Sequence, residues 1–168
     1  PLWYRPSSAV GGQFTIAETA DVGIRIALTG KPDMADLGTA VHHCIARAGA
    51  RGAVEQADVS SILSNWGAGN TVDNAAVVAQ LNAFRAWCAE RWPGCPTFVE
   101  VPIEANRPDG TRVRGRIDLL VQSSNGWILV DHKSNPGGAD RNEQLTQEHG
   151  PQLAAYAEAL VAATGTPV

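Results

Sequence analysis

The sequence predicts an α/β protein in which helices flank an antiparallel meander of three strands. Residues 115–133 read as two apolar strand-like runs separated by a polar segment with an Asn-Gly dipeptide, which is typical of a hairpin turn. Residues 73–92 repeat apolar side chains at helical spacing and end at a Pro-Gly pair that stops a helix. A chain of 168 residues is long enough for a sizeable core, because folding at this size buries roughly 70% of the unfolded surface.

The composition is that of an ordinary water-soluble globular chain, with 44% hydrophobic and 18% charged residues. No apolar run approaches the ~20 residues that span a membrane, and no signal peptide pattern is present. We therefore expect a cytoplasmic protein with no membrane partner. The net charge is −4, whereas a protein that binds nucleic acid by itself usually has a basic surface. If the chain acts on DNA, we expect another component to deliver the strand.

Two features of the chain suggest that it is a piece of a longer polypeptide. It contains one methionine, Met34, and it begins at Pro1. We expect a single domain over residues 1–168, with an irregular lead-in over residues 1–13, which are rich in Pro, Gly and Ser. Residues 22–28 alternate apolar and other side chains, which is consistent with a strand.

The cysteine pattern argues against a bound cluster. Cys44, Cys88 and Cys95 make an odd number, and no two of them have the C-x-x-C spacing. This pattern disfavours a zinc ribbon or a complete four-cysteine iron–sulfur site within these residues. We expect buried, reduced thiols instead.

Four helices are predicted, over residues 33–50, 56–65, 73–92 and 144–163. Asp33 or Asp36 can cap the first helix, and Asp58 can cap the second. The last helix is expected to be interrupted or capped again near Gly150 and Pro151, because proline lacks the backbone N–H that a helix interior needs.

Three strands are predicted, over residues 97–105, 111–121 and 127–132. The second contains Asp118, and the third runs into Asp131, His132 and Lys133. Side chains two residues apart on a strand share a face, so Asp131 and Lys133 are expected to project the same way. Pairing across the hairpin can bring Asp118 close to Asp131.

Two neighbouring carboxylates repel each other unless they share a proton or bind a cation. With oxygen ligands that cation is expected to be Mg²⁺ or Mn²⁺. The alternative is a salt-bridged hairpin in which Lys133 neutralises Asp131 on a solvated face. Asp-x-Lys is common by chance, so these residues alone leave both interpretations open.

Four short motifs occur in a defined order along the chain. They are Gly38-Thr-Ala-Val-His42, Gly115-Arg-Ile-Asp118, Asp131-His-Lys133 and Gln152-Leu-Ala-Ala-Tyr156. Their order and spacing resemble the RecB-like nucleases of the PD-(D/E)xK superfamily, which often form the C-terminal part of helicases such as the RecB, AddA and UvrD-like proteins. The resemblance covers roughly residues 37–160 and implies a restriction-endonuclease-like core with a mixed central sheet.

The resemblance implies a role for each motif residue. His42, Asp118 and Asp131 look like metal ligands, and the main-chain carbonyl of His132 would complete the oxygen set. Lys133 looks like the catalytic lysine. On the residues alone, His42 could instead be an ordinary structural histidine beside an apolar helix stripe.

Two further parts of the resemblance concern the last helix and the first strand. Gln152 and Tyr156 look like the Q-x-x-x-Y motif, which contacts the DNA backbone or orients the site. The expected catalytic set is therefore completed by these two residues, although they could also mark an ordinary amphipathic boundary. Glu100 falls where many relatives carry a glutamate on the first strand.

The resemblance implies a Mg²⁺-dependent DNA exonuclease, with Mn²⁺ as a substitute metal and no iron–sulfur cluster. Its substrate would be a single strand delivered by a helicase motor, on the parent chain or a partner subunit, in DNA double-strand-break repair and recombination. Two alternatives remain open. One is a catalytically silent nuclease-like domain for DNA binding or assembly, and the other is a stand-alone endonuclease of phage or restriction type.

Overall fold

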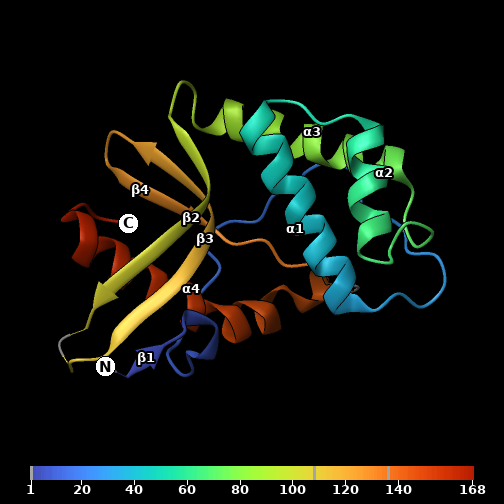
Figure 1. The fold of residues 1–168 in the computed structure, drawn as a ribbon. Coiled ribbons are helices and arrows are strands. Elements are labelled where there is room, and N and C mark those ends of the chain that lie inside the picture. The colour runs from blue at the N-terminus through green and yellow to red at the C-terminus, as the bar shows by residue number, and fades with distance from the viewer. Residues whose placement is uncertain (1, 108, 136) are drawn as a thin grey trace. The chain divides into compact units, whose positions relative to one another are not determined.

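The computed structural model describes residues 2–107, 109–135 and 137–168, and its chain divides into two compact units (Figure 1). The first, here called the sheet unit, comprises Pro1–Thr19, Pro96–Asp131 and Asn135–Val168. The second, the helical unit, comprises Ala20–Cys95 and His132–Ser134. The expectation of one domain over residues 1–168 stays a prediction, and each unit is considered separately below.

The sheet unit is built around one central strand of a mixed sheet. The strands are β1 (Trp3–Tyr4), β2 (Thr97–Asn106), β3 (Arg112–Ser123) and β4 (Gly126–Val130). Strand β3 pairs antiparallel with β2 and with β4, and its first residues pair parallel with β1. The predicted hairpin turn is confirmed, because Ser123 pairs with Gly126 across a two-residue loop. The third strand, however, ends at Val130 and not at His132 as predicted.

The predicted irregular lead-in is wrong at β1, which is a short strand. Trp3 pairs with Arg112 and Tyr4 with Val113, and the backbone N–H of Arg112 donates to the carbonyl of Leu2 at 2.9 Å. A 3₁₀ turn, η1 (Pro6–Ser8), follows it. Two residues are too few to show a strand pattern, so this non-local pairing leaves no local signal in the sequence.

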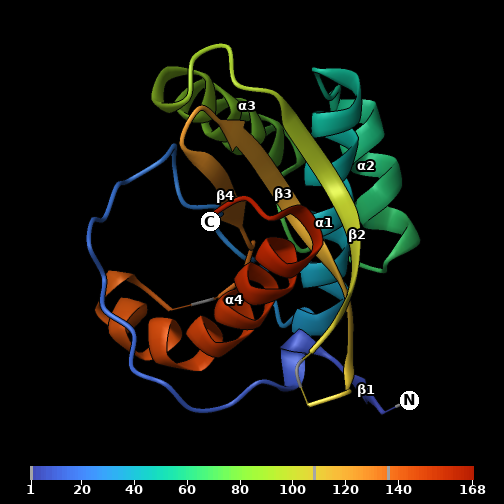
Figure 2. The same ribbon diagram turned by 90° about the vertical axis from the view of Figure 1, so that its left-hand side faces the viewer.

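Helix α4 (Asn142–Thr164) follows a short 3₁₀ turn, η2 (Ala139–Arg141), and lies alongside the strands of the sheet unit (Figure 2). Its apolar side chains pack with those of the strands. The buried core of this unit consists of Ile103, Val113, Ile117, Leu120, Tyr156, Ala159 and Leu160. Burial of apolar surface in this core is the main force that holds the helix against the sheet.

The predicted break near Pro151 is also wrong, because α4 continues through it. Gly150 and Pro151 are buried, and a Cβ at Gly150 would overlap the ring of Phe14. The side-chain amide of Gln147 donates to the carbonyl of Phe14 at 2.6 Å. These tertiary contacts outweigh the unfavourable helix propensity of a Gly-Pro pair, which is a local property.

The helical unit contains α1 (Met34–Arg51), α2 (Gln56–Asn65) and α3 (Asn74–Arg91), as the sequence predicts. Asp33 caps α1 by accepting from the backbone N–H groups of Ala35 and Asp36, and Asp73 caps α3. The predicted cap of α2 is wrong: its N-cap is Glu55, and Asp58 instead pairs with Arg47 of α1 at 2.9 Å. The unit has its own core, formed by Leu37, Ala40, Cys44, Ala48, Val54, Val59, Leu63, Ala68, Val72, Val77 and Leu81.

The predicted strand over residues 22–28 is wrong as well. The segment forms only an isolated bridge between Leu28 and Val72, and Ile24 is 85% exposed. The carbonyl of Val22 accepts a hydrogen bond from the side chain of Gln80 at 2.6 Å. A side chain therefore satisfies a backbone group that a strand would have paired with another strand.

The three cysteines are free thiols. Cys44 is buried as expected, whereas Cys88 and Cys95 are only half-buried. Burial raises the pKa of Cys44 and of Cys88 to about 11, so both remain protonated at neutral pH. Among the helices that the structure describes, none has the length and apolar character to cross a membrane.

A close contact joins β3 to α4 at Gly115. A Cβ added there would lie 2.7 Å from Cε1 and 2.8 Å from the hydroxyl of Tyr156. The backbone N–H of Arg116 donates to this hydroxyl at 3.3 Å. Glycine thus lets the tyrosine lie directly on the strand, close enough to reach its backbone.

This packing predicts that Gly115→Ala destabilises the protein. Because an inserted methyl group must displace the ring, we expect the free energy of unfolding to fall by about 1–3 kcal/mol. Urea unfolding measures the change, and Tyr156→Ala supplies the second background for a double-mutant cycle. In the Tyr156→Ala background the added methyl group contacts no ring, so the free energy of unfolding should fall much less. An equal loss in both backgrounds would contradict the proposed contact.

Candidate metal centre

The sheet unit places two carboxylates opposite each other on β2 and β3. Val99 pairs with Leu119 and Val101 with Ile117, so the register sets Glu100 against Asp118. Carboxylate oxygens of these two residues lie within 4.8 Å of each other. Two oxygen ligands so close are suited to a hard divalent cation such as Mg²⁺ or Mn²⁺.

Glu100 has an unusual backbone. Its φ is 53°, and it is the only residue other than glycine with a positive φ in the described part of the chain. A left-handed conformation costs a non-glycine residue roughly 1–2 kcal/mol. Strain of this kind clusters at functional sites, so the conformation of Glu100 singles it out as a functional candidate.

Arg116 is the ionic partner of Glu100. Its Nη1 lies 3.2 Å from Oε2 of the glutamate. The side chain of Arg116 is 66% exposed, so water screens this pair and it contributes little stability. The guanidinium nonetheless offsets part of the repulsion between Glu100 and Asp118.

The hairpin brings Asp131 toward the same place. Leu119 pairs with Val130, so a continuation of the same register by one step would set Asp131 opposite Asp118, although β4 itself has ended. Burial raises the pKa of Tyr156, and the negative charges of Asp131 and Asp118 raise it further. Both carboxylates therefore act on the same phenol, which stays neutral at physiological pH.

The two predicted residues of α4 form a chain of hydrogen bonds. Nε2 of Gln152 donates to Oδ1 of Asp131 at 3.2 Å, and Gln152 is also hydrogen-bonded to Tyr156. Tyr156 in turn accepts from the backbone N–H of Arg116. Gln152 and Tyr156 are one helical turn apart, so they share a face of α4. Their contacts support the interpretation that this motif orients the site.

In the helical unit, residues 132–134 contact one face of α1. Nε2 of His42 lies 2.8 Å from the carbonyl oxygen of His132. A Cβ at Gly38, one turn earlier, would lie 2.8 Å from Oγ of Ser134. The ring of His132 packs edge to face against Phe84, with centroids 5.0 Å apart. The His132 side chain thus packs against Phe84 of α3 while its carbonyl faces His42.

The spacing of this pair fits either of two situations. With Nε2 protonated, His42 donates a hydrogen bond to the carbonyl of His132. Adjacent ligands of an octahedral ion with bonds of ~2.1 Å are separated by about 3.0 Å, which is nearly the same distance. The separation of the two atoms is therefore compatible with one coordination shell.

The predicted site residues thus fall into two sets. Asp118, Asp131, Gln152 and Tyr156 come together in the sheet unit, where Glu100 joins them. The other predicted residues, His42, His132 and Lys133, belong to the helical unit. The peptide bond from Asp131 to His132 joins the two sets covalently.

The predicted strand face shared by Asp131 and Lys133 is wrong. Strand β4 stops at Val130, so the two-residue period does not extend to either residue. The side chain of Lys133 is exposed. His43, to which the sequence assigns no role, stacks on Trp66 with ring centroids 5.4 Å apart.

Comparison with known proteins identifies the family of this chain. The family model of the PD-(D/E)XK nuclease superfamily matches residues 13–168. A search of curated proteins finds no match. The family match spans both compact units and nearly the whole sequence, and the predicted acidic residues of the sheet unit lie within it. The chain belongs to the PD-(D/E)XK nuclease superfamily.

Proposed function

We propose that this nuclease is a metal-dependent DNA exonuclease of the RecB-like branch. In this proposal it acts in the bacterial cytoplasm with a helicase during double-strand-break repair and recombination. The observation that carries the metal-dependent activity is the close approach of the Glu100 and Asp118 carboxylates across β2 and β3, with Asp131 directly after the last residue pair of β3 and β4. The order of the four motifs supports assignment to the RecB-like branch.

The proposed ligands of the ion are all hard donors or a histidine nitrogen. Asp118 and Asp131 would hold the ion, with Glu100 as an additional carboxylate, together with His42 and the carbonyl of His132. Mg²⁺ suits the carboxylate and carbonyl oxygens of this donor set, and Mn²⁺ can replace it. When bound, the ion lowers the pKa of a water molecule and neutralises charge on the phosphoryl oxygens.

The other motif residues act around these ligands. Gln152 holds Asp131 by its hydrogen bond, as carboxylate ligands require for a fixed orientation. Tyr156 stays neutral and connects Gln152 to the backbone of β3. Lys133 orients the attacking water or stabilises the developing negative charge. Hydrolysis in this scheme leaves a 5′-phosphate and a 3′-hydroxyl.

The helicase partner is proposed on the basis of charge and resemblance. The net charge of −4 gives little general electrostatic attraction to DNA. A helicase motor that delivers a single strand would bring the substrate to the site without that attraction. The partner is either the parent helicase chain or another subunit. A silent, DNA-binding role is less well supported, because all the catalytic motif residues are present.

The first prediction concerns the carboxylates. Asp118→Asn should abolish Mg²⁺ or Mn²⁺ binding and lower cleavage by at least ~10²-fold, since it removes a charged ligand. Glu100→Gln should weaken metal binding. The matched control is Glu104→Gln on the same strand, because Glu104 pairs with Arg112 at 3.4 Å. Calorimetric metal titration and cleavage of end-labelled DNA measure both effects, and an active Asp118→Asn protein would refute the site.

The second prediction concerns Lys133. Lys133→Ala should retain metal affinity, because the lysine is not a ligand, while the cleavage rate falls by ~10²–10⁴-fold. Lys31→Ala, which alters the other lysine of the chain, is the matched control. The assay requires Mg²⁺ and, where needed, the helicase partner. Cleavage at the normal rate by Lys133→Ala would reject a catalytic role and favour a simple ion pair.

The third prediction concerns delivery of the strand. Residues 1–168 alone should bind duplex DNA weakly, because a net charge of −4 limits counterion release. Fluorescence anisotropy over a range of salt concentrations measures the affinity and its salt dependence. Tight, strongly salt-dependent duplex binding by this segment would remove the reason for proposing a delivering partner.

A further inference from the structure

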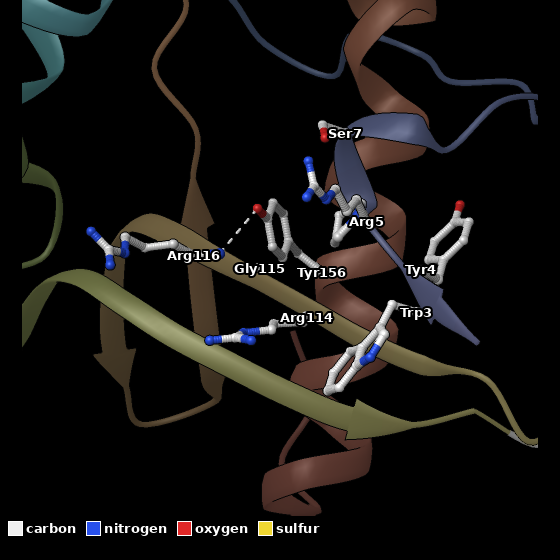
Figure 3. A pocket seen from close by; sticks show the side chains of 9 residues that line it. Trp3, Tyr4, Arg5, Ser7, Arg114, Gly115, Arg116 and Tyr156 are labelled. Atoms are coloured by element: carbon white, nitrogen blue, oxygen red, sulfur yellow. Dashed lines mark hydrogen bonds between the residues drawn. The ribbon is translucent and has the colours of Figure 1, made fainter. Parts of the chain in front are cut away.

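A pocket of about 550 Å³ opens on the sheet unit beside the Gly115–Tyr156 contact (Figure 3). Two segments far apart in the sequence line it: the chain around β1 and η1, and the first half of β3. Tyr156 of α4 forms part of its wall. The lining residues are Trp3, Tyr4, Arg5, Pro6, Ser7, Arg114, Gly115, Arg116 and Tyr156. All of them belong to the sheet unit, so one compact part of the chain forms the pocket.

The charge of this pocket is opposite to that of the chain. Its lining contains Arg5, Arg114 and Arg116 and no carboxylate, although the whole chain has a net charge of −4. Glu100, which lies outside the lining, pairs with Arg116 at 3.2 Å and offsets part of this charge. Guanidinium groups bind phosphate with paired, charge-assisted hydrogen bonds. Ser7 adds a hydroxyl group to the lining. The pocket is therefore suited to a phosphate-bearing ligand.

The direction of β3 relates the pocket to the carboxylates. Arg114, Arg116 and Asp118 alternate along the strand and so share one face. The two arginines precede Asp118 by four and two residues, which corresponds to ~14 and ~7 Å along the strand. A step of two residues, ~7 Å, is about twice the ~3.4 Å rise of one nucleotide in a duplex strand, so it fits one nucleotide only where the strand is stretched out. Successive phosphates leading away from Asp118 could thus meet Arg116 and then Arg114.

An exposed aromatic ring distinguishes this pocket from a simple phosphate site. Trp3 is 51% exposed, and the guanidinium of Arg114 lies 5.8 Å from its ring centroid. Figure 3 shows Trp3 and Arg114 as neighbouring side chains at the pocket. Aromatic rings next to arginines bind single strands by stacking on bases, independently of sequence. A base in a duplex is already stacked and paired, which favours a single strand here.

We propose that this pocket binds single-stranded DNA one to two nucleotides from the phosphate that is cut. Arg116 and Arg114 contact successive phosphates, Arg5 adds a third cationic contact, and the ring of Trp3 stacks on a base. The position of the bound strand relative to the cut phosphate rests on the nuclease function proposed above. Binding itself does not require cleavage, which allows the two to be tested separately.

The test measures binding of a fluorescent oligothymidylate to residues 1–168 in EDTA at low salt, where no cleavage takes place. Arg114→Ala should weaken binding by roughly tenfold and reduce the magnitude of the salt slope by about 0.7, the value for one phosphate contact on a single strand. Trp3→Ala should weaken binding by at least about fivefold, and Trp3→Phe should restore most of it. The control is Arg85→Ala in the helical unit, which changes the net charge equally and should have a much smaller effect.

Three outcomes would overturn the assignment. Equal weakening by Arg114→Ala and Arg85→Ala would show a general charge effect and no pocket. Tighter binding of the matching oligouridylate would assign the pocket to RNA. Full competition by inorganic phosphate with no effect of Trp3→Ala would reduce it to an anion site.

Cleavage assays with Mg²⁺ then separate this proposal from the proposed function. If both are right, Arg114→Ala raises KM for a single strand and changes kcat much less than Lys133→Ala does. Wild-type protein that binds the oligonucleotide through Arg114 and Trp3 but never cleaves DNA would refute the nuclease proposal alone. Normal cleavage and normal KM in Arg114→Ala would refute the pocket alone.

Discussion

The antiparallel pairing of β3 with both of its neighbours is the constraint on which the candidate site depends. One strand, β3, carries Asp118, and its register with β2 fixes Glu100 while its register with β4 fixes the approach of Asp131. A shift of a single residue in either pairing would turn every side chain of the shifted strand to the other face. The apolar residues Val113 and Ile117 of β3 are buried in the core, which makes such a shift costly.

The elements that the sequence predicts well are those with local causes. Helices α1 and α3 follow from aspartate caps and apolar repeats. The β3–β4 hairpin follows from the Asn125-Gly126 signal, although the two loop residues are Ser124 and Asn125 and Gly126 already begins β4. The errors have non-local causes. Strand β1 exists through its pairing with β3, and α4 continues past Pro151 while Gly150 packs on Phe14. No pattern within a short window of sequence contains those contacts.

The same distinction applies to the candidate site. Asp118, Asp131, Gln152 and Tyr156 are predictable because each lies in a short motif, and the structure brings them together in one unit. Glu100 is harder to single out, because its left-handed backbone cannot be read from the alternation of a strand. The arginine-lined pocket has no sequence signal at all. Trp3 and Arg114 are separated by most of the chain and meet only through the β1–β3 pairing.

The ion pair between Arg116 and Glu100 has a thermodynamic consequence. When Glu100 coordinates a cation, its carboxylate attracts the guanidinium of Arg116 less strongly. Cation binding therefore weakens the ion pair. An anion that draws Arg116 away would likewise leave Glu100 more available to a cation. Such linkage is reciprocal: each ligand strengthens the binding of the other by the same factor. In the absence of both ligands, Arg116 and Glu100 would neutralise each other. Binding of a cation to Glu100 and binding of the negatively charged strand to Arg116 would then be coupled.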